Sequence, residues 1–254
     1  MRAACLPAFA SAAVEQTAAI IVIGNEILSG KVVDTNSPYL ARELRALGVD
    51  LRRVVVIPDE VEVIAEVVRE LAPKVDYVFT SGGVGPTHDD VTMEGVAQGL
   101  GRHVVRHPAL ERFWRDYFGR EAQSALKMAE VPEGGELLLG EGITVPVVKV
   151  ANVYVLPGIP EFFRGDFEAI RERFRLAPFH LRRVYLRTSE GAIAAKLHEL
   201  LAAYPDLLLG SYPTVSDPAY DVLVTLESKD AACVEEALKS LLALLPPQAV
   251  LRWE

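Results

Sequence analysis

The sequence predicts an α/β fold with a mostly parallel sheet, followed by a small α+β domain. Short apolar runs, typical of strands buried on both faces, alternate with segments in which apolar residues recur at helical spacing. Strands that alternate with helices need crossover connections, and these leave consecutive strands parallel. A break at Ala177-Pro178 is followed by a shorter run of strands and helices, which is long enough for a small second domain.

The first hundred or so residues are expected to form three strands, each followed by a helix. The strands are expected at Ala18–Ile23, Val49–Ile57 and Val75–Thr80. The helices are expected at 37–47, 60–71 and 90–100. Ser37 is a suitable N-cap and Pro38 suits the first helical position, so the first helix should begin there.

The pattern is looser after Pro108. Helices are expected at 109–118, at 121–129 and from the PGIPEFF segment (157–163) to about residue 175, and strands at 136–139 and 147–156. Beyond the break, the expected elements are strands at 183–187, 207–212, 220–227 and 249–252 and helices at 190–203 and 231–244. We therefore expect one domain over residues 18–176 and a small α+β domain over 177–254.

The first 17 residues, MRAACLPAFASAAVEQT, are rich in alanine and carry one arginine and a single acid, Glu15. This composition is typical of a disordered or leader-like tail, which we place outside the fold.

Composition excludes several classes of partner. The formal net charge of −9 argues against a nucleic-acid ligand, because phosphate binding needs clustered lysine and arginine. No apolar run approaches the roughly 18 residues that span a membrane. Cys5 and Cys233 form neither a CxxC pair nor a Cys/His cluster, which favours a reducing, cytoplasmic compartment.

The stretch TSGGVGPTHDDVT, residues 80–92, has the strongest chemical signal. Gly82, Gly83 and Gly85 remove Cβ atoms where a strand turns toward a helix, and backbone N–H groups in such a turn form an anion site. Asp89 and Asp90 follow directly, and only one of them can cap the helix. A carboxylate beside a phosphate repels it unless a cation intervenes, which favours Mg²⁺ or a similar metal. These residues alone leave a plain turn with a capped helix equally open.

Other polar residues follow the first two strands. Asn25 and Glu26 follow the first, the DTN segment (34–36) precedes the next helix, and Asp59 and Glu60 follow the second. Ligands of parallel sheets bind beyond the carboxyl ends of the strands, so this polar excess predicts a ligand site at that edge.

The segments IGNEILSGKVVDTNSPYLARELRALGV, VVVIPDE and TSGGVGPTHDDVTMEGVAQGLG together resemble the MoaB/Mog family of molybdopterin-binding domains. The likeness is closest to the N-terminal domain of CinA-type proteins and to the molybdopterin-binding-like domain of eukaryotic FAD synthases. NVYVLPGIPEFF (152–163) and LGSYPTVSDPAYDVLVTLES (209–228) resemble the FAD synthases in particular. The resemblance covers nearly the whole chain after Thr17 and implies a three-layer fold, a pocket for a nucleotide or pterin phosphate, and a homo-oligomer (dimer or trimer).

The resemblance also implies roles for individual residues. By motif, Asp90 corresponds to a catalytic aspartate and Asp59 to a second functional aspartate of the family. With the residues of the glycine stretch, the expected ligand- and phosphate-binding set is Gly82, Gly83, Gly85, Thr87, Glu26, Asn36 and Glu94, and the expected metal ligands are Asp89 and Asp90. The chain departs from the family at Asn25, where CinA-type proteins have aspartate, and at Asp89, where Mog-type proteins have arginine.

Three functions remain open at this stage. The first is hydrolysis of a nucleotide pyrophosphate, such as FAD or ADP-ribose, with a divalent metal (Mg²⁺, Mn²⁺ or Co²⁺). The second is molybdopterin binding or adenylyl transfer to molybdopterin, which Asp89 in place of arginine disfavours. The third is non-catalytic binding of a nucleotide or pterin.

Overall fold

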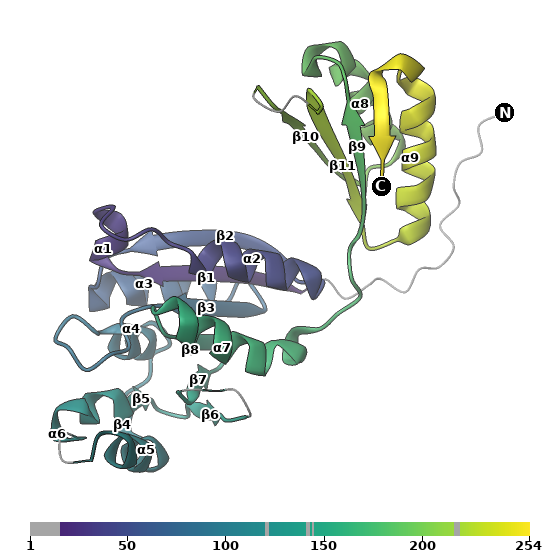
Figure 1. Cartoon of the computed structure of the whole chain (residues 1–254). Helices are drawn as coiled ribbons and strands as arrows, with labels where there is room; N and C mark the ends of the chain where they lie inside the picture. The colour runs from purple at the N-terminus through teal and green to yellow at the C-terminus, as the bar shows by residue number, and fades with distance from the viewer. Residues whose placement is uncertain (1–15, 120–121, 141–142, 144, 216–218) are drawn as a thin grey trace. The chain divides into compact units, whose positions relative to one another are not determined.

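The computed structural model describes residues 16–119, 122–140, 143, 145–215 and 219–254 (Figure 1). They form two compact units, one ending at Leu176 and the other spanning Ala177–Glu254. Most of the expected N-terminal tail lies outside the described residues, but Thr17 already belongs to the first strand, so a tail reaching residue 17 is one residue too long.

A sheet of mixed direction forms the centre of the first unit, in the order β2-β1-β3-β8-β7-β6. Four strands run parallel: β1 (Thr17–Ile23), β2 (Asp50–Ile57), β3 (Tyr77–Ser81) and β8 (Val153–Leu156). Two more strands complete it, each antiparallel to its neighbour: β7 (Val147–Val150) beside β8, and β6 (Glu136–Leu138) beside β7. The carboxyl ends of the parallel strands therefore meet at one edge of the sheet.

The expected single strand at 147–156 is wrong, because a tight turn divides it into β7 and β8. Ala151 adopts a positive φ of 51°, and the Asn152 side chain donates to the backbone oxygens of Ala72 (2.9 Å) and Val75 (2.8 Å). Both strands are apolar, so the run looks continuous in the sequence. The turn moves the segment after Leu156 to the same edge as the loop after β3.

Helices cover both faces of this sheet (Figure 1). The helices of the unit are α1 (Asn25–Leu28), α2 (Asn36–Ala46), α3 (Val61–Leu71), α4 (Thr92–Gly99), α5 (Pro108–Phe118), α6 (Ala122–Ala125) and α7 (Pro160–Ile170), with 3₁₀ turns η2 (Leu126–Ala129) and η3 (Arg171–Phe174). One core joins the sheet to α3, α4 and α5, and the other joins it to α2 and α7. The three-layer α/β fold is thus confirmed.

Two helix starts differ from expectation. Ser37 is not the N-cap of α2, which begins at Asn36; instead Asp34 Oδ1 accepts hydrogen bonds from the backbone N–H groups of Asn36 and Ser37, both at 3.0 Å. Helix α4 begins at Thr92 rather than at Asp90, so neither aspartate of the DD pair caps it through its side chain. The DD pair therefore belongs to the loop.

The segment between α4 and β6 is more broken than expected. Short strands β4 (Val104–Arg106) and β5 (Glu130–Pro132) pair with each other and were not expected. The helix expected at 121–129 is divided into α6 and η2. Strands of three residues carry no detectable alternation, which explains why sequence patterns missed them.

The second unit is a four-stranded antiparallel sheet with two helices. Its elements are β9 (His180–Leu186), α8 (Glu190–Ala203), β10 (Leu208–Pro213), β11 (Val222–Ser228), α9 (Ala231–Leu244), the 3₁₀ turn η4 (Pro247–Ala249) and β12 (Val250–Trp253). The strand order is β10-β11-β9-β12, and the unit has its own apolar core. The expected α+β domain is confirmed. No helix among the residues described in either unit is both long and apolar enough to cross a bilayer.

We predict that Phe79→Ala destabilises the first unit by about 3–5 kcal/mol, the usual cost of removing a large buried ring. The Phe79 ring is fully buried and packs against Tyr154, Phe174 and Phe167, with ring centroids 5.4, 5.1 and 5.9 Å away. Urea unfolding measures the change. Val54→Ala is the control, since Val54 is 46% exposed on β2 and should change stability by less than about 0.5 kcal/mol. Equal effects of both substitutions would contradict this account of the core.

Candidate functional site

A cavity of about 590 Å³ lies at the carboxyl edge of the parallel strands. One part of its lining is the glycine loop after β3, from Gly82 to Pro86, together with Asp90. A second part is Pro157–Pro160, the segment that follows β8. The rest is mostly apolar: Val32, Trp114, Tyr117, Phe118, Met128, Val145 and Phe162. A pocket of this size and composition, with a few convergent polar groups, is typical of a small-molecule site.

The glycine loop depends on Gly82 and Gly83, whose φ angles are 106° and 64°. A Cβ on Gly82 would overlap the Ile23 carbonyl oxygen, and one on Gly83 would overlap the Thr92 hydroxyl. That hydroxyl donates to the Gly82 oxygen (2.8 Å), while Thr92 N–H donates to the Gly83 oxygen (3.0 Å). Only glycine permits both the backbone angles and this close approach.

Three consecutive backbone donors of the loop are left without a partner. Gly82 N–H donates to the Leu156 oxygen at 3.3 Å, so it is occupied. In contrast, the N–H groups of Gly83, Val84 and Gly85 make no hydrogen bond to any residue in the described ranges. All of these residues line the cavity, and successive free N–H groups are the usual components of an anion site.

The carboxylates of Asp89 and Asp90 both lie against the Thr87 hydroxyl. Thr87 Oγ1 is 2.6 Å from Asp89 Oδ1 and also contacts Asp90 Oδ2, which accepts from Thr87 N–H at 2.8 Å. The hydrogen bond from the Thr87 hydroxyl is the main reason that the pKa of Asp89 lies below its usual value. A hydroxyl has one hydrogen and can donate to only one carboxylate at a time. Thr87 therefore holds the acidic pair together, and its expected contact with the ligand stays a prediction.

Lys127, which sequence analysis did not single out, contacts the loop that carries the acidic pair. Its ammonium donates to the Thr87 backbone oxygen (3.1 Å) and lies 3.6 Å from Glu94 Oε1. It thus connects η2 with the acidic loop and with the expected residue Glu94 in the first turn of α4. Lys127 follows the glycine loop by about 40 residues, in a segment with no motif, so only the fold could reveal its place.

Asn36 and Glu26 lie at a small pocket of about 70 Å³ next to the glycine loop, and Gly82 lines this pocket as well. The Asn36 side chain is buried, and its Nδ2 donates to Ser81 Oγ (2.9 Å) and to the Gly158 oxygen (2.8 Å). Asn36 therefore joins the loop after β8 to the end of β3. Glu26 is exposed and lines both pockets.

Asp59 is not among the described residues that line the cavity. Its Oδ2 accepts from the Asn25 backbone N–H at 2.7 Å, at the start of the short helix α1. Asp59 therefore holds the backbone of the residue that precedes Glu26. Its expected catalytic role stays a prediction.

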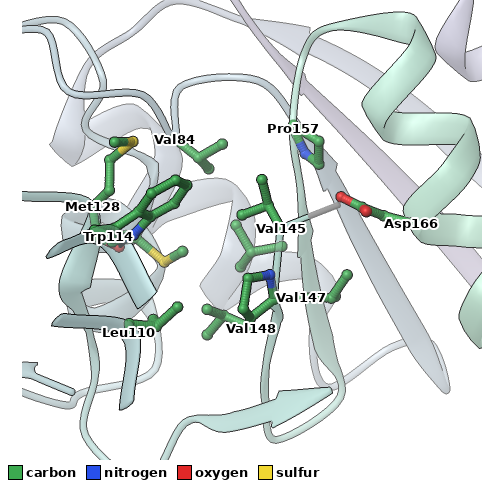
Figure 2. A pocket seen from close by; sticks show the side chains of 12 residues that line it. Val84, Leu110, Trp114, Met128, Val145, Val147, Val148, Pro157 and Asp166 are labelled. Atoms are coloured by element: carbon green, nitrogen blue, oxygen red, sulfur yellow. Dashed lines mark hydrogen bonds between the residues drawn. The ribbon is translucent and has the colours of Figure 1, made fainter. Parts of the chain in front are cut away.

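A narrow apolar pocket of about 40 Å³ shares Val84, Trp114 and Met128 with the main cavity (Figure 2). Figure 2 shows the buried Asp166 carboxylate extending from α7 toward it. Trp114 Nε1 donates to the Met128 oxygen at 3.1 Å, so the indole ring is held in place. Neither Asp166 nor the apolar lining was expected from the sequence. The PGIP segment could have been, because it follows an apolar run as the other site loops do.

Side chains that could coordinate a metal ion do not form a large cluster in the part of the chain that the structure describes. No group of three or more His, Cys, Asp or Glu side chains gathers closely enough to hold a metal ion. The pair Asp89 and Asp90 is compatible with Mg²⁺, which usually takes one or two carboxylates and completes its shell with water and substrate phosphates. Two carboxylates are too few to coordinate a metal ion fully. They fit a metal ion whose remaining ligands are water and the phosphates of a substrate.

Comparison with family models divides the chain at the same place as the structure. Residues 19–175 match a model described as "Probable molybdopterin binding domain". Residues 178–254 match the model "FAD synthase, middle domain".

Relatives extend over both parts. A protein of Archaeoglobus fulgidus is 37% identical over 89% of this chain and 96% of its own length. A protein named "Probable FAD synthase" in Caenorhabditis elegans is 33% identical over 91% of this chain, but this chain spans only about half of that protein (50%). A "CinA-like protein" of Fervidobacterium nodosum is 34% identical over 62% of this chain and 41% of its own length.

A solved structure of a CinA protein also matches this chain. The crystal structure of a CinA protein "with unknown function" from Thermoplasma acidophilum matches with a TM-score of 0.58 and 30% identity, over 63% of this chain and 98% of that one. The resemblance expected from the sequence is thereby confirmed. The chain belongs to the molybdopterin-binding domain family and is similar to CinA-like proteins and FAD synthases within it.

Proposed function

We propose that this protein hydrolyses a nucleotide pyrophosphate of the FAD or ADP-ribose class with the help of a divalent metal. The observation that supports it most is that Asp90 lines the same cavity as three free backbone donors, while Asp89 lies against the same Thr87 hydroxyl as Asp90. The FAD synthase and CinA-like relatives support a nucleotide as the ligand.

The backbone N–H groups of Gly83, Val84 and Gly85 would bind one phosphate. They donate hydrogen bonds at no cost in side-chain entropy, and their angles are already set by the fold. Gly82 would not donate to the phosphate, because its N–H is bonded to the Leu156 oxygen. Its lack of a side chain instead lets the loop pack closely against Ile23.

Asp90 and Asp89 would hold the metal ion between them and the second phosphate. Both carboxylates contact the Thr87 hydroxyl, which can donate its hydrogen to only one of them. A cation bound between them would also reduce their mutual repulsion. When bound, Mg²⁺, Mn²⁺ or Co²⁺ would polarise the phosphoryl group and activate a water molecule. Lys127 would keep the loop in place by its hydrogen bond to the Thr87 oxygen.

The remaining expected residues would act around this centre. Glu26 is exposed at the cavity and free to contact the ligand or the metal, and Asp59 would hold the turn that carries it. Asn36 would shape the loop through Ser81 and Gly158, and Glu94 would act through Lys127.

We predict that Asp90→Asn lowers turnover of FAD or ADP-ribose by about 100-fold or more and leaves substrate binding within a few-fold, because the amide cannot replace the charge of the carboxylate. AMP release with Mg²⁺, Mn²⁺ or Co²⁺, followed by chromatography, measures the effect. Asp116→Asn is the control, since Asp116 is an exposed aspartate of α5 that does not line the cavity.

AMP release by wild type in the presence of metal, lost in Asp90→Asn and kept in Asp116→Asn, is the expected result. Failure of the wild-type protein to release AMP from either substrate with any of the metals would overturn hydrolysis. Binding of molybdopterin without turnover would then favour the pterin-binding alternative.

The glycine loop gives a second prediction. Gly83→Ala should weaken AMP binding by about 10- to 100-fold, because a hydrogen bond to a charged group contributes about 1.5–3 kcal/mol and the added Cβ would push the loop off Thr92. Gly101→Ala is the matched control: its φ of 66° is close to the 64° of Gly83, but its Cβ would meet no atom within 4 Å. Calorimetric titration with AMP compares the two. Equal weakening by both variants would mean that backbone strain and not the loop geometry is responsible.

A further inference from the structure

Aromatic side chains of α5 make the apolar part of the main cavity. Trp114, Tyr117 and Phe118 are spaced i, i+3 and i+4, so they share one face of the helix, and all of them line the cavity. Their rings form a connected cluster: Trp114 and Tyr117 have centroids 5.9 Å apart, and Tyr117 and Phe118 have centroids 4.9 Å apart.

The members of this cluster differ in exposure in a way that core packing does not explain. Trp114 is only 5% exposed and is held by its hydrogen bond to the Met128 oxygen. Tyr117, in contrast, is 63% exposed, and Ile159 from the segment after β8 is 54% exposed in the same cavity. Two large apolar side chains left in water at a cavity mark a surface that another molecule covers.

The glycine loop adds a second requirement for a ligand of this cavity, beside the aromatic cluster. The free N–H groups of Gly83–Gly85 line the same space as the aromatic cluster and favour an anion. A molecule that satisfies both parts carries a phosphate and, within a few bonds, a flat apolar ring. Aromatic rings prefer offset-stacked or edge-to-face contacts with such a ring, and tyrosine and tryptophan provide them at low cost in side-chain entropy.

We propose that Trp114, Tyr117 and Phe118 form a ring-binding subsite, in which Tyr117 stacks on the planar ring of the ligand whose phosphate is held by Gly83–Gly85. This rests on the proposed anion site but does not require hydrolysis. In a dinucleotide the ring could be the adenine or the second base, and both have the same chemistry: a flat aromatic ring joined to a phosphate through a sugar or sugar alcohol.

Direct binding of three monophosphates to the full chain tests the subsite without metal or turnover. AMP and FMN each carry a ring, whereas ribose 5-phosphate carries none. We expect the wild-type protein to bind AMP, FMN or both at least ten-fold more tightly than ribose 5-phosphate by calorimetry. Tighter binding of FMN identifies the ring as a flavin, and tighter binding of AMP identifies it as adenine.

Substitutions of Tyr117 distinguish stacking by its aromatic ring from simple apolar contact with the ligand. Tyr117→Ala should remove the advantage of the ring-bearing ligand and leave ribose 5-phosphate unaffected, while Tyr117→Phe should keep the advantage. Tyr117→Leu, which keeps apolar area without a ring, should lose most of it. Val105→Ala is the control for folding, as Val105 is 39% exposed on β4 and does not line the cavity.

Two results would overturn the proposal. One is equal affinity of the wild-type protein for the ligands with and without a ring. The other is a Tyr117→Ala variant that binds all three ligands like wild type but self-associates less in sedimentation, since a second copy of the chain would then be what covers Tyr117. A wild-type protein that hydrolyses FAD or ADP-ribose but binds the ligands with and without a ring equally would sink the subsite alone, and ring binding without hydrolysis would sink the proposed function alone.

Discussion

The close contact of three chain segments at Gly82 is the constraint on which the site depends. Its N–H bonds to the end of β8 at Leu156, its oxygen accepts from Thr92 at the start of α4, and the space of its missing Cβ is taken by the end of β1 at Ile23. A side chain here would separate all of these segments. The free donors of the loop therefore exist because one residue without a side chain brings two strand ends and a helix start together.

The start of the parallel sheet could be predicted because β1 and β3 are continuous apolar runs that are almost entirely buried. Both were expected to within two residues at each end, since a continuous apolar run between helices has few other interpretations. The division of 147–156 could not be foreseen. Its turn uses an alanine with positive φ, held by Asn152 through contacts to residues more than 70 positions away. No local pattern encodes such a contact.

The candidate site likewise combines residues that are adjacent in the sequence, which could be predicted, with residues from distant segments, which could not. Gly82, Gly83, Gly85, Asp89 and Asp90 stand together in the sequence, and the structure keeps them together at or beside the cavity. Lys127 and the aromatic face of α5 reach the site from segments that carry no motif, and their approach depends on short strands and 3₁₀ turns that sequence patterns do not detect. An aromatic stripe at helical spacing also looks like ordinary core. Only the exposure of Tyr117 sets it apart.

The two units of the chain have separate apolar cores, one of which is built entirely from residues after Ala177. A unit that completes its own core can be gained or lost in evolution without leaving a neighbour's interior uncovered. One CinA-like relative aligns over 166 residues, close to the length of the first unit, while the FAD synthases align over both. The two family models that match the chain meet at this same junction, so each unit carries its own core and its own sequence signature.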